Sequence, residues 1–232
     1  MRSVDVCLTH QDFDNYDHKG KIVVVIDVLR ATSTINTLLF LGADHVRPIG
    51  SLEECKSLKD HDYIIMAERL GKKVEGFDYG NSPTKLTEKD IKGKKVAIAT
   101  SNGSKAIIKS EGSEMTILCS FLNIESVINR IKKSESDVIL LCSGWLGKTN
   151  LEDTLCAGGI VASLDNFEIE SDTALMAKAL HENTNDILET MKLSSHAKRL
   201  SGYDNKIDIE FCSRVNTQPI IPLLEGNQIV LS

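Results

Sequence analysis

Runs of apolar residues alternate with amphipathic segments along most of the chain. Residues 22–26 are five consecutive Ile and Val side chains, a composition typical of a strand that is buried on both faces of a sheet. An apolar helical pattern follows at residues 35–39 and ends near Gly42. Further strands are predicted at residues 1–10, 44–49, 63–68, 94–100, 115–120 and 137–142. This repetition of strand, loop and helix predicts an α/β fold, a layered sandwich in which helices cover a largely parallel or mixed sheet.

The final third of the chain is predicted to be mostly helical. The helix expected after the last of these strands is rich in small residues, which indicates close packing against a neighbour. Residues 171–202 have a helical pattern with breaks, and the alternation in residues 206–213 predicts a short strand. No linker divides the chain, so we expect one α/β unit over residues 1–232, with two similar lobes at 1–115 and 116–232 as the alternative.

Composition narrows the classes of function. The chain has 232 residues, a formal net charge of −6 and only 5% aromatic residues. An acidic, aromatic-poor protein lacks the basic face and the stacking surface that nucleic acid binding requires. No apolar run reaches the ~20 residues of a membrane-spanning helix, and no signal-peptide core is evident at the N-terminus. The six cysteines show no CxxC spacing, so we expect reduced thiols in a cytoplasmic protein that acts on a small molecule; a homo-oligomer is left open.

Charged and hydroxyl side chains gather where the 22–26 strand ends. Asp27 follows the strand directly, Arg30 comes three residues later, and Thr32 stands where the next helix begins. Ligands of open α/β sheets bind at the carboxyl ends of the strands, and a helix N-terminus there offers N–H groups to an anion. The alternative is that Asp27 and the hydroxyls only cap the helix. Glu68 repeats the arrangement at the end of a later strand.

Two loops add polar groups to the predicted strand ends. Residues 68–83 form a long glycine-rich loop that ends in a Gly-Asn-Ser-Pro turn containing Asn81, and loops of this length are often functional. The loop after the 94–100 strand contains the hydroxyl, amide and glycine residues Thr100, Ser101, Asn102 and Gly103. Because such groups can donate hydrogen bonds to phosphate oxygens, we interpret this segment as an anion-binding loop rather than a plain helix cap.

Three other mechanisms fit the sequence less well. Residues 142–149 resemble a P-loop, except that Cys142 replaces its first glycine and Trp145 is bulky for a loop whose amides wrap phosphates. Cys142 as a phosphatase nucleophile would need an arginine to close the phosphate loop, and the nearby cation is Lys148. An aspartyl-phosphate mechanism at Asp27 is disfavoured because the residue two positions later is not an aspartate.

Metal chemistry is the interpretation that fits best. Magnesium prefers a few carboxylates, several waters and the phosphate oxygens of the substrate. Asp27 and Glu68 supply carboxylates at two strand ends, so we expect them to hold Mg²⁺ beside the anion-binding loop. Glu152 and Asp153 begin a later helix, where they either complement its dipole or take part in the chemistry. The residues therefore predict metal-assisted hydrolysis of a phosphate ester.

Five short segments stand out in order along the chain. They are residues 27–34 (DVLRATST), 68–69 with 76–83 (GFDYGNSP), 100–103 (TSNG), 142–144 with 151–153 (LED), and 208–212 (DIEFC). Together they resemble the successive motifs of the 2-phosphosulfolactate phosphatase family, with Ser104 standing where threonine is expected. The resemblance implies a magnesium-dependent phosphatase that converts 2-phosphosulfolactate to 3-sulfolactate and phosphate in coenzyme M biosynthesis. A phosphatase of another small phospho-acid and a non-catalytic nucleotide- or anion-binding module are the alternatives.

The expected mechanism assigns a role to each of these residues. Asp27 and Glu68 hold the magnesium ion, while Arg30 and the 100–103 loop neutralise the phosphoryl oxygens as charge redistributes. Asp153 positions the attacking water or protonates the leaving oxygen, with Asp208 as the alternative for these roles. The other predicted substrate-binding residues are Thr32, Asn81, Arg69 and Lys148, of which the last two meet the carboxylate and the sulfonate.

Overall fold

The computed structural model of the chain describes residues 1–169, 171–201 and 206–232. The strands are β1 (Arg2–Cys7), β2 (Ile22–Ile26), β3 (His45–Pro48), β4 (Tyr63–Arg69), β5 (Lys72–Lys73), β6 (Lys95–Ala99), β7 (Met115–Cys119), β8 (Val138–Cys142), β9 (Phe167–Ile169), β10 (Pro222–Glu225) and β11 (Gln228–Leu231). The α-helices are α1 (Ala31–Phe40), α2 (Leu52–Ser57), α3 (Glu88–Ile91), α4 (Gly103–Lys109), α5 (Ile124–Lys132), α6 (Leu151–Ser163), α7 (Asp172–Glu182), α8 (Ile187–Leu193), α9 (Ser195–Ser201) and α10 (Lys206–Cys212). In the described part of the chain, none of these helices combines the length and the apolar character that crossing a membrane requires.

The eleven strands of the described residues form one mixed, mostly parallel sheet. Its order is β5-β4-β6-β3-β11-β10-β7-β2-β8-β1-β9. Strands β4, β6 and β3 form one parallel block, and β7, β2, β8, β1 and β9 form another. The C-terminal hairpin β10–β11 joins the two blocks by pairing antiparallel with β7 and β3. Because β2 lies between β7 and β8, the two blocks do not correspond to residues 1–115 and 116–232.

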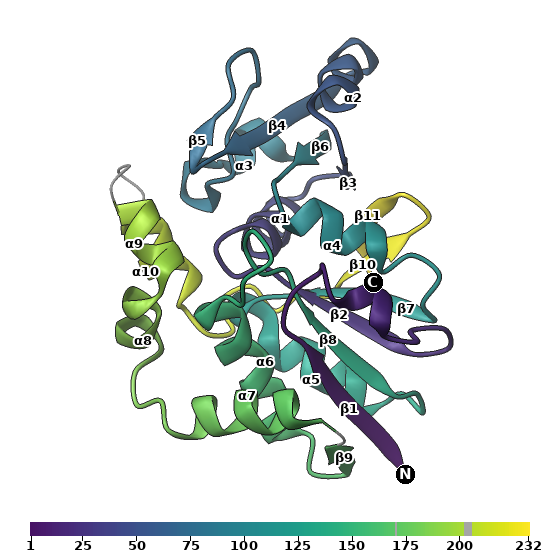
Figure 1. Cartoon of the computed structure of the whole chain (residues 1–232). Helices are drawn as coiled ribbons and strands as arrows, with labels where there is room; N and C mark the ends of the chain where they lie inside the picture. Colours follow the sequence, from purple (N-terminus) through teal and green to yellow (C-terminus); the bar gives the residue numbers. More distant parts are fainter. Residues whose placement is uncertain (170, 202–205) are drawn as a thin grey trace.

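Helices cover both faces of the sheet, which confirms the predicted α/β fold (Figure 1). All five residues of β2 are buried because alternate side chains enter opposite layers. Val24 packs in the layer of α5, α6 and α7, whereas Val23 and Val25 pack in the layer of α1 and α4. Figure 1 shows α8, α9 and α10 together along one side of the molecule. The end of β2 is buried, and Asp27, which follows it, is also buried.

The small residues of α6 allow α7 to approach closely, as the sequence predicts. A Cβ atom built on Gly158 would lie 2.0 Å from the carbonyl oxygen of Ala177 in α7. A side chain at this position would therefore push the two helices apart. This contact holds α6 in place against α7. It thereby also fixes the first turn of α6, which lies next to the end of β2.

Residues 206–212 form helix α10, so the predicted short strand at this position is wrong. The prediction relied on an alternation of polar and apolar residues over only a few positions. In the helix, Asp208, Ile209 and Cys212 are buried on one face, while Ile207 is 65% exposed. Packing of this face against α8 and α9 outweighs the local alternation.

Candidate active site

A tight turn after β2 fixes Asp27 against the start of α1. Oδ1 of Asp27 accepts a hydrogen bond from the backbone N–H of Ala31 at 3.0 Å. The hydroxyl of Thr32 donates to the backbone carbonyl of Asp27 at 2.8 Å and accepts from its backbone N–H at 3.0 Å. Asp27 is only 7% exposed, and it lines a cavity. Thr32 therefore holds the turn in place, and it is not among the cavity-lining residues.

A cavity of about 600 Å³ opens at the end of β2. Its walls come from the β2–α1 turn, the end of β4, the loops that precede Pro83, α4 and α6, and helix α9. The predicted site residues in its lining are Asp27, Arg30, Glu68, Asn81, Thr100, Ser101 and Asn102. Segments far apart in the sequence thus meet at one cavity, at the carboxyl ends of β2, β4 and β6.

Arg30 lines the cavity while Asp208 of α10 fixes its guanidinium. Nη1 of Arg30 donates to Oδ2 of Asp208 at 2.5 Å, and both side chains are almost completely buried. Oδ1 of Asp208 accepts hydrogen bonds from the hydroxyls of Ser82 at 2.8 Å and Thr84 at 2.6 Å. Both carboxylate oxygens are engaged in this way, so Asp208 positions Arg30 and does not itself line the cavity.

The two charged residues at the end of β4 have different surroundings. Glu68 lines the cavity, and its Oε1 accepts a hydrogen bond from the backbone N–H of Gly71 at 2.6 Å. Nη1 of Arg69 donates to the backbone carbonyls of Glu68 at 2.8 Å and Ala99 at 3.3 Å. Arg69 therefore braces the ends of β4 and β6, and it is absent from the cavity lining that the described residues form.

The loop before α4 is held by hydrogen bonds between its own ends. Oγ1 of Thr100 accepts from the backbone N–H of Ser104 at 2.9 Å, and the Ser104 hydroxyl accepts from the backbone N–H of Thr100 at 3.0 Å. Residues 100–102 line the cavity, while Gly103 lies behind them against Asp27. A Cβ atom on Gly103 would lie 2.6 Å from Oδ2 of Asp27, so only glycine permits this approach.

Lys148 and Asp153 lie outside the cavity lining. Lys148 is exposed in a tight turn, where its backbone N–H and carbonyl pair with those of Trp145 at 2.9 and 2.8 Å. Asp153 is completely buried: Oδ1 accepts from the backbone N–H of Val28 at 2.9 Å, and Oδ2 accepts from Nδ2 of Asn150 at 3.3 Å. Through its hydrogen bond with Val28, Asp153 thus stabilises the turn that carries Asp27.

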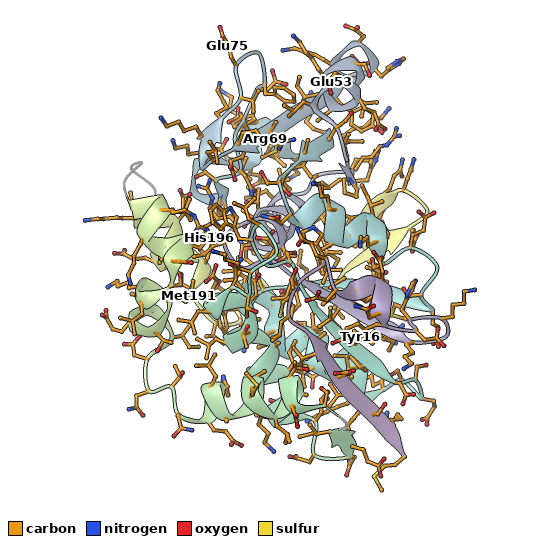
Figure 2. All side chains as sticks on the ribbon, in the orientation of Figure 1. Tyr16, Glu53, Arg69, Glu75, Met191 and His196 are labelled. Atoms are coloured by element: carbon orange, nitrogen blue, oxygen red, sulfur yellow. The ribbon has the colours of Figure 1, made fainter. Side chains whose placement is uncertain are left out.

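Helix α9 contributes three cavity residues that the sequence did not indicate: His196, Arg199 and Leu200. His196 and Arg199 lie one helical turn apart and both line the cavity. Nδ1 of His196 lies 3.0 Å from Oε1 of Glu152, whose side chain is completely buried. Figure 2 shows His196 on the inner side of α9, toward the middle of the molecule. The guanidinium carbon of Arg199 lies 3.5 Å from the ring centroid of Trp145, a cation–π contact.

Buried carboxylates crowd one side of the cavity. Burial raises the pKa of Asp27 to about 6; a backbone N–H and the charge of His196 oppose this rise, and the carboxylates of Glu152 and Glu68 add to it. Burial also raises the pKa of Asp153 well above its usual value, and the charges of Glu152 and Asp27 reinforce the effect. A cluster of this kind favours a cation nearby because a positive charge offsets the mutual repulsion.

All six cysteines are free and buried, which argues against a cysteine nucleophile. Burial raises the pKa of Cys142 well above its usual value and that of Cys7 to about 12, so both thiols stay protonated at neutral pH. We expect iodoacetamide to leave the folded protein unlabelled and its activity unchanged, whereas the denatured chain accepts a label on every cysteine. Mass spectrometry measures both states. Rapid alkylation of Cys142 in the folded protein, with loss of activity, would restore the nucleophile hypothesis.

Comparison with known proteins identifies relatives that match almost the whole chain. The family model described as 2-phosphosulpholactate phosphatase matches residues 7–227. A protein of Caldanaerobacter subterraneus subsp. tengcongensis, named "Probable 2-phosphosulfolactate phosphatase", is 37% identical over 94% of this chain and 93% of its own length. Proteins of the same name from Thermotoga maritima and Clostridium acetobutylicum are 39% identical over 91% of this chain and 92% of theirs, and 33% identical over 98% and 99%. The family-model match includes every segment that forms the cavity.

Proposed function

The chain belongs to the 2-phosphosulpholactate phosphatase family, and we propose that it hydrolyses 2-phosphosulfolactate to 3-sulfolactate and phosphate with the help of Mg²⁺. The observation that supports this most directly is the cavity at the end of β2, which combines two carboxylates, two arginines and the 100–102 loop. Its volume of about 600 Å³ suits a small ester rather than a polymer.

The carboxylates that line the cavity fit a magnesium ion. Oδ1 of Asp27 and Oε1 of Glu68 each accept a hydrogen bond from a backbone N–H, and both residues retain a second carboxylate oxygen. The described residues contain no cluster of three His, Cys, Asp or Glu side chains arranged to hold a metal. Magnesium needs no such cluster, since it is often bound by one or two carboxylates with waters and substrate phosphate oxygens. We assign Asp27 and Glu68 as its ligands; the bound ion would neutralise phosphoryl charge and lower the pKa of bound water.

Arg30 and the 100–102 loop are proposed to bind the phosphoryl group. Asp208 holds the Arg30 guanidinium at the cavity wall, so this cation needs little reorganisation when the substrate enters. The hydroxyl and amide groups of residues 100–102 line the same cavity. Fixed donors of this kind stabilise phosphoryl oxygens as their charge changes during the reaction.

Arg199 is proposed to bind the carboxylate or the sulfonate of the substrate. Its Nη2 atom is buried and has no hydrogen-bond partner among the described residues, although the side chain lines the cavity. Stacking on Trp145 holds the guanidinium plane, which favours bidentate binding of an anion. We prefer Arg199 to Arg69 and Lys148 for this role, because the latter two lie outside the cavity lining.

The cytoplasm is the proposed location. The six cysteines are free thiols in the structure. Free thiols are typical of proteins that remain in a reducing compartment.

Phosphate release from four compounds tests this function. We expect release from 2-phosphosulfolactate to exceed release from 2-phospholactate, phosphoglycolate and ATP, because Arg199 adds an ion pair with the extra anionic group. Excess EDTA is expected to abolish release, and added Mg²⁺ to restore it. Release only from the other phospho-acids would contradict the proposed substrate but would remain consistent with the proposed metal site. Saturable ATP binding without release from any compound would favour a binding module.

A further inference from the structure

Glu152 and His196 form an acid–base pair in the wall of the cavity. Glu152 is completely buried, and the His196 side chain is 16% exposed. Oε1 of Glu152 lies 3.0 Å from Nδ1 of His196, and Oε2 has no hydrogen-bond partner among the described residues. A buried carboxylate is costly unless it is paired, and the imidazole of His196 is the hydrogen-bond partner that stabilises Glu152.

This pairing determines which part of the imidazole is available for chemistry. A carboxylate at one ring nitrogen fixes the tautomer and the orientation of the ring, which leaves the other nitrogen for the reacting atoms. Nδ1 of His196 is engaged with Glu152 at the buried side. Because His196 also lines the cavity, Nε2 on the opposite side of the ring is the atom available there.

The other acids at this end of the sheet are already engaged. Asp153 and Asp208 lie outside the cavity lining, and both oxygens of each accept hydrogen bonds. Asp27 and Glu68 are the proposed magnesium ligands, and arginines do not release protons at neutral pH. Among the described residues that line the cavity, His196 is therefore the titratable residue that remains. The ring nitrogen on its cavity side is neither a proposed magnesium ligand nor part of an ion pair.

We propose that Nε2 of His196, held by Glu152, donates a proton to the ester oxygen that leaves phosphorus. This inference rests on the phosphatase function proposed above. His196 is then a catalytic residue, and Glu152 is a positioning residue. General acids of this kind are needed because an alkoxide is a poor leaving group.

The protons balance without a further reactant. When the bond between phosphorus and the ester oxygen breaks, its electron pair stays on that oxygen, which takes the Nε2 proton and leaves as the alcohol. Water forms the new bond to phosphorus and carries both of its protons into dihydrogen phosphate. That product returns one proton to the imidazole through solvent, so His196 is restored and monohydrogen phosphate departs.

A matched pair of substrates isolates the proton transfer. The pair is 2-phosphosulfolactate and its analogue with sulfur in place of the bridging ester oxygen, since a thiolate leaves without being protonated. In His196→Asn, the amide occupies the place of Nδ1 and still donates to Glu152, but Nε2 is lost. We expect kcat for the oxygen ester to fall about 10²- to 10⁴-fold, and kcat for the sulfur analogue less than about tenfold.

Two further variants separate positioning from folding. Glu152→Gln has nearly the same volume and keeps an oxygen in the buried position, so we expect a smaller loss of kcat, again confined to the oxygen ester. His61→Asn changes an exposed histidine in the turn after α2, and we expect it to leave both rates unchanged. Melting temperatures close to that of the wild type are expected for all three variants.

The outcomes distinguish the two proposals. A wild-type protein that releases phosphate from neither compound overturns the proposed function and this inference with it. Wild-type activity together with an unchanged ratio of the two rates in His196→Asn overturns the role of His196 and leaves the phosphatase function in place. A rise of about tenfold or more in the preference for the sulfur analogue supports the proton transfer.

Discussion

Asp27→Asn is expected to lower kcat about 10³-fold or more, a loss of roughly 4 kcal/mol of transition-state stabilisation. The hydrogen bond from the Ala31 N–H can be kept, because the amide oxygen of asparagine also accepts one, although more weakly than a carboxylate does. The negative charge that would bind Mg²⁺ is lost, so affinity for the ion should fall with kcat. Phosphate release measures the first effect, and calorimetric titration with Mg²⁺ measures the second. Near-normal kcat would remove Asp27 from the mechanism.

The same variant should be more stable than the wild type when magnesium is absent. Burial raises the pKa of Asp27 from its usual 3.8 to about 6, so the folded protein disfavours the charged carboxylate. The penalty is fully present above pH 6 and disappears as the pH falls through about 6 toward the lower pKa of the unfolded chain. We expect Asp27→Asn to melt a few degrees higher at pH 8, with the difference vanishing near pH 4. Asp165→Asn, in an exposed turn after α6, is the control that should change neither melting nor kcat.

Local sequence indicated the part of the cavity lining that lies at strand ends. Asp27 and residues 100–102 come immediately after β2 and β6, and Glu68 is the second-last residue of β4; all of them line the cavity. That the ends of β4 and β6 share a cavity with the end of β2 depends on the β10–β11 hairpin, across which the strand direction reverses between the two parallel blocks. The buried run of β2 and the alternation of strand, loop and helix likewise predicted the α/β fold.

The rest of the cavity depends on packing that one sequence does not encode locally. Glu152 and His196 are 44 residues apart, and their contact requires α9 to turn back over α6. Glu152 stands at the start of α6, where an acid that only complements the helix dipole is equally expected. Only its burial in the structure reveals that the carboxylate needs a partner. Arg69 is a second example. Alternation along the strand places the side chains of Glu68 and Arg69 on opposite faces of the sheet, but it does not indicate which of the two enters the cavity.

Gly103→Ala is expected to damage both stability and activity. Its Cβ would lie 2.3 Å from Cβ of Ala31 and 2.6 Å from Oδ2 of Asp27, so the first turns of α4 and α1 must separate. Overpacking of this kind costs about 1–3 kcal/mol, which thermal melting will show as a lower transition temperature. Displacement of Asp27 by about 1 Å should lower kcat about 10²-fold. Wild-type values for both quantities would show that this close approach is not required.

A double variant separates the two contacts of Gly103. Gly103→Ala combined with Ala31→Gly removes the 2.3 Å clash and keeps the 2.6 Å approach to Asp27. We expect it to recover much of the lost melting temperature but little of the lost kcat, because the carboxylate stays displaced. Gly50→Ala is the matched control: its Cβ would meet only Cδ1 of Ile108, at 3.7 Å, so melting and kcat should match the wild type. Recovery of kcat in the double variant would instead assign the damage to the separation of the helices, and the position of Asp27 would then depend on α1 alone.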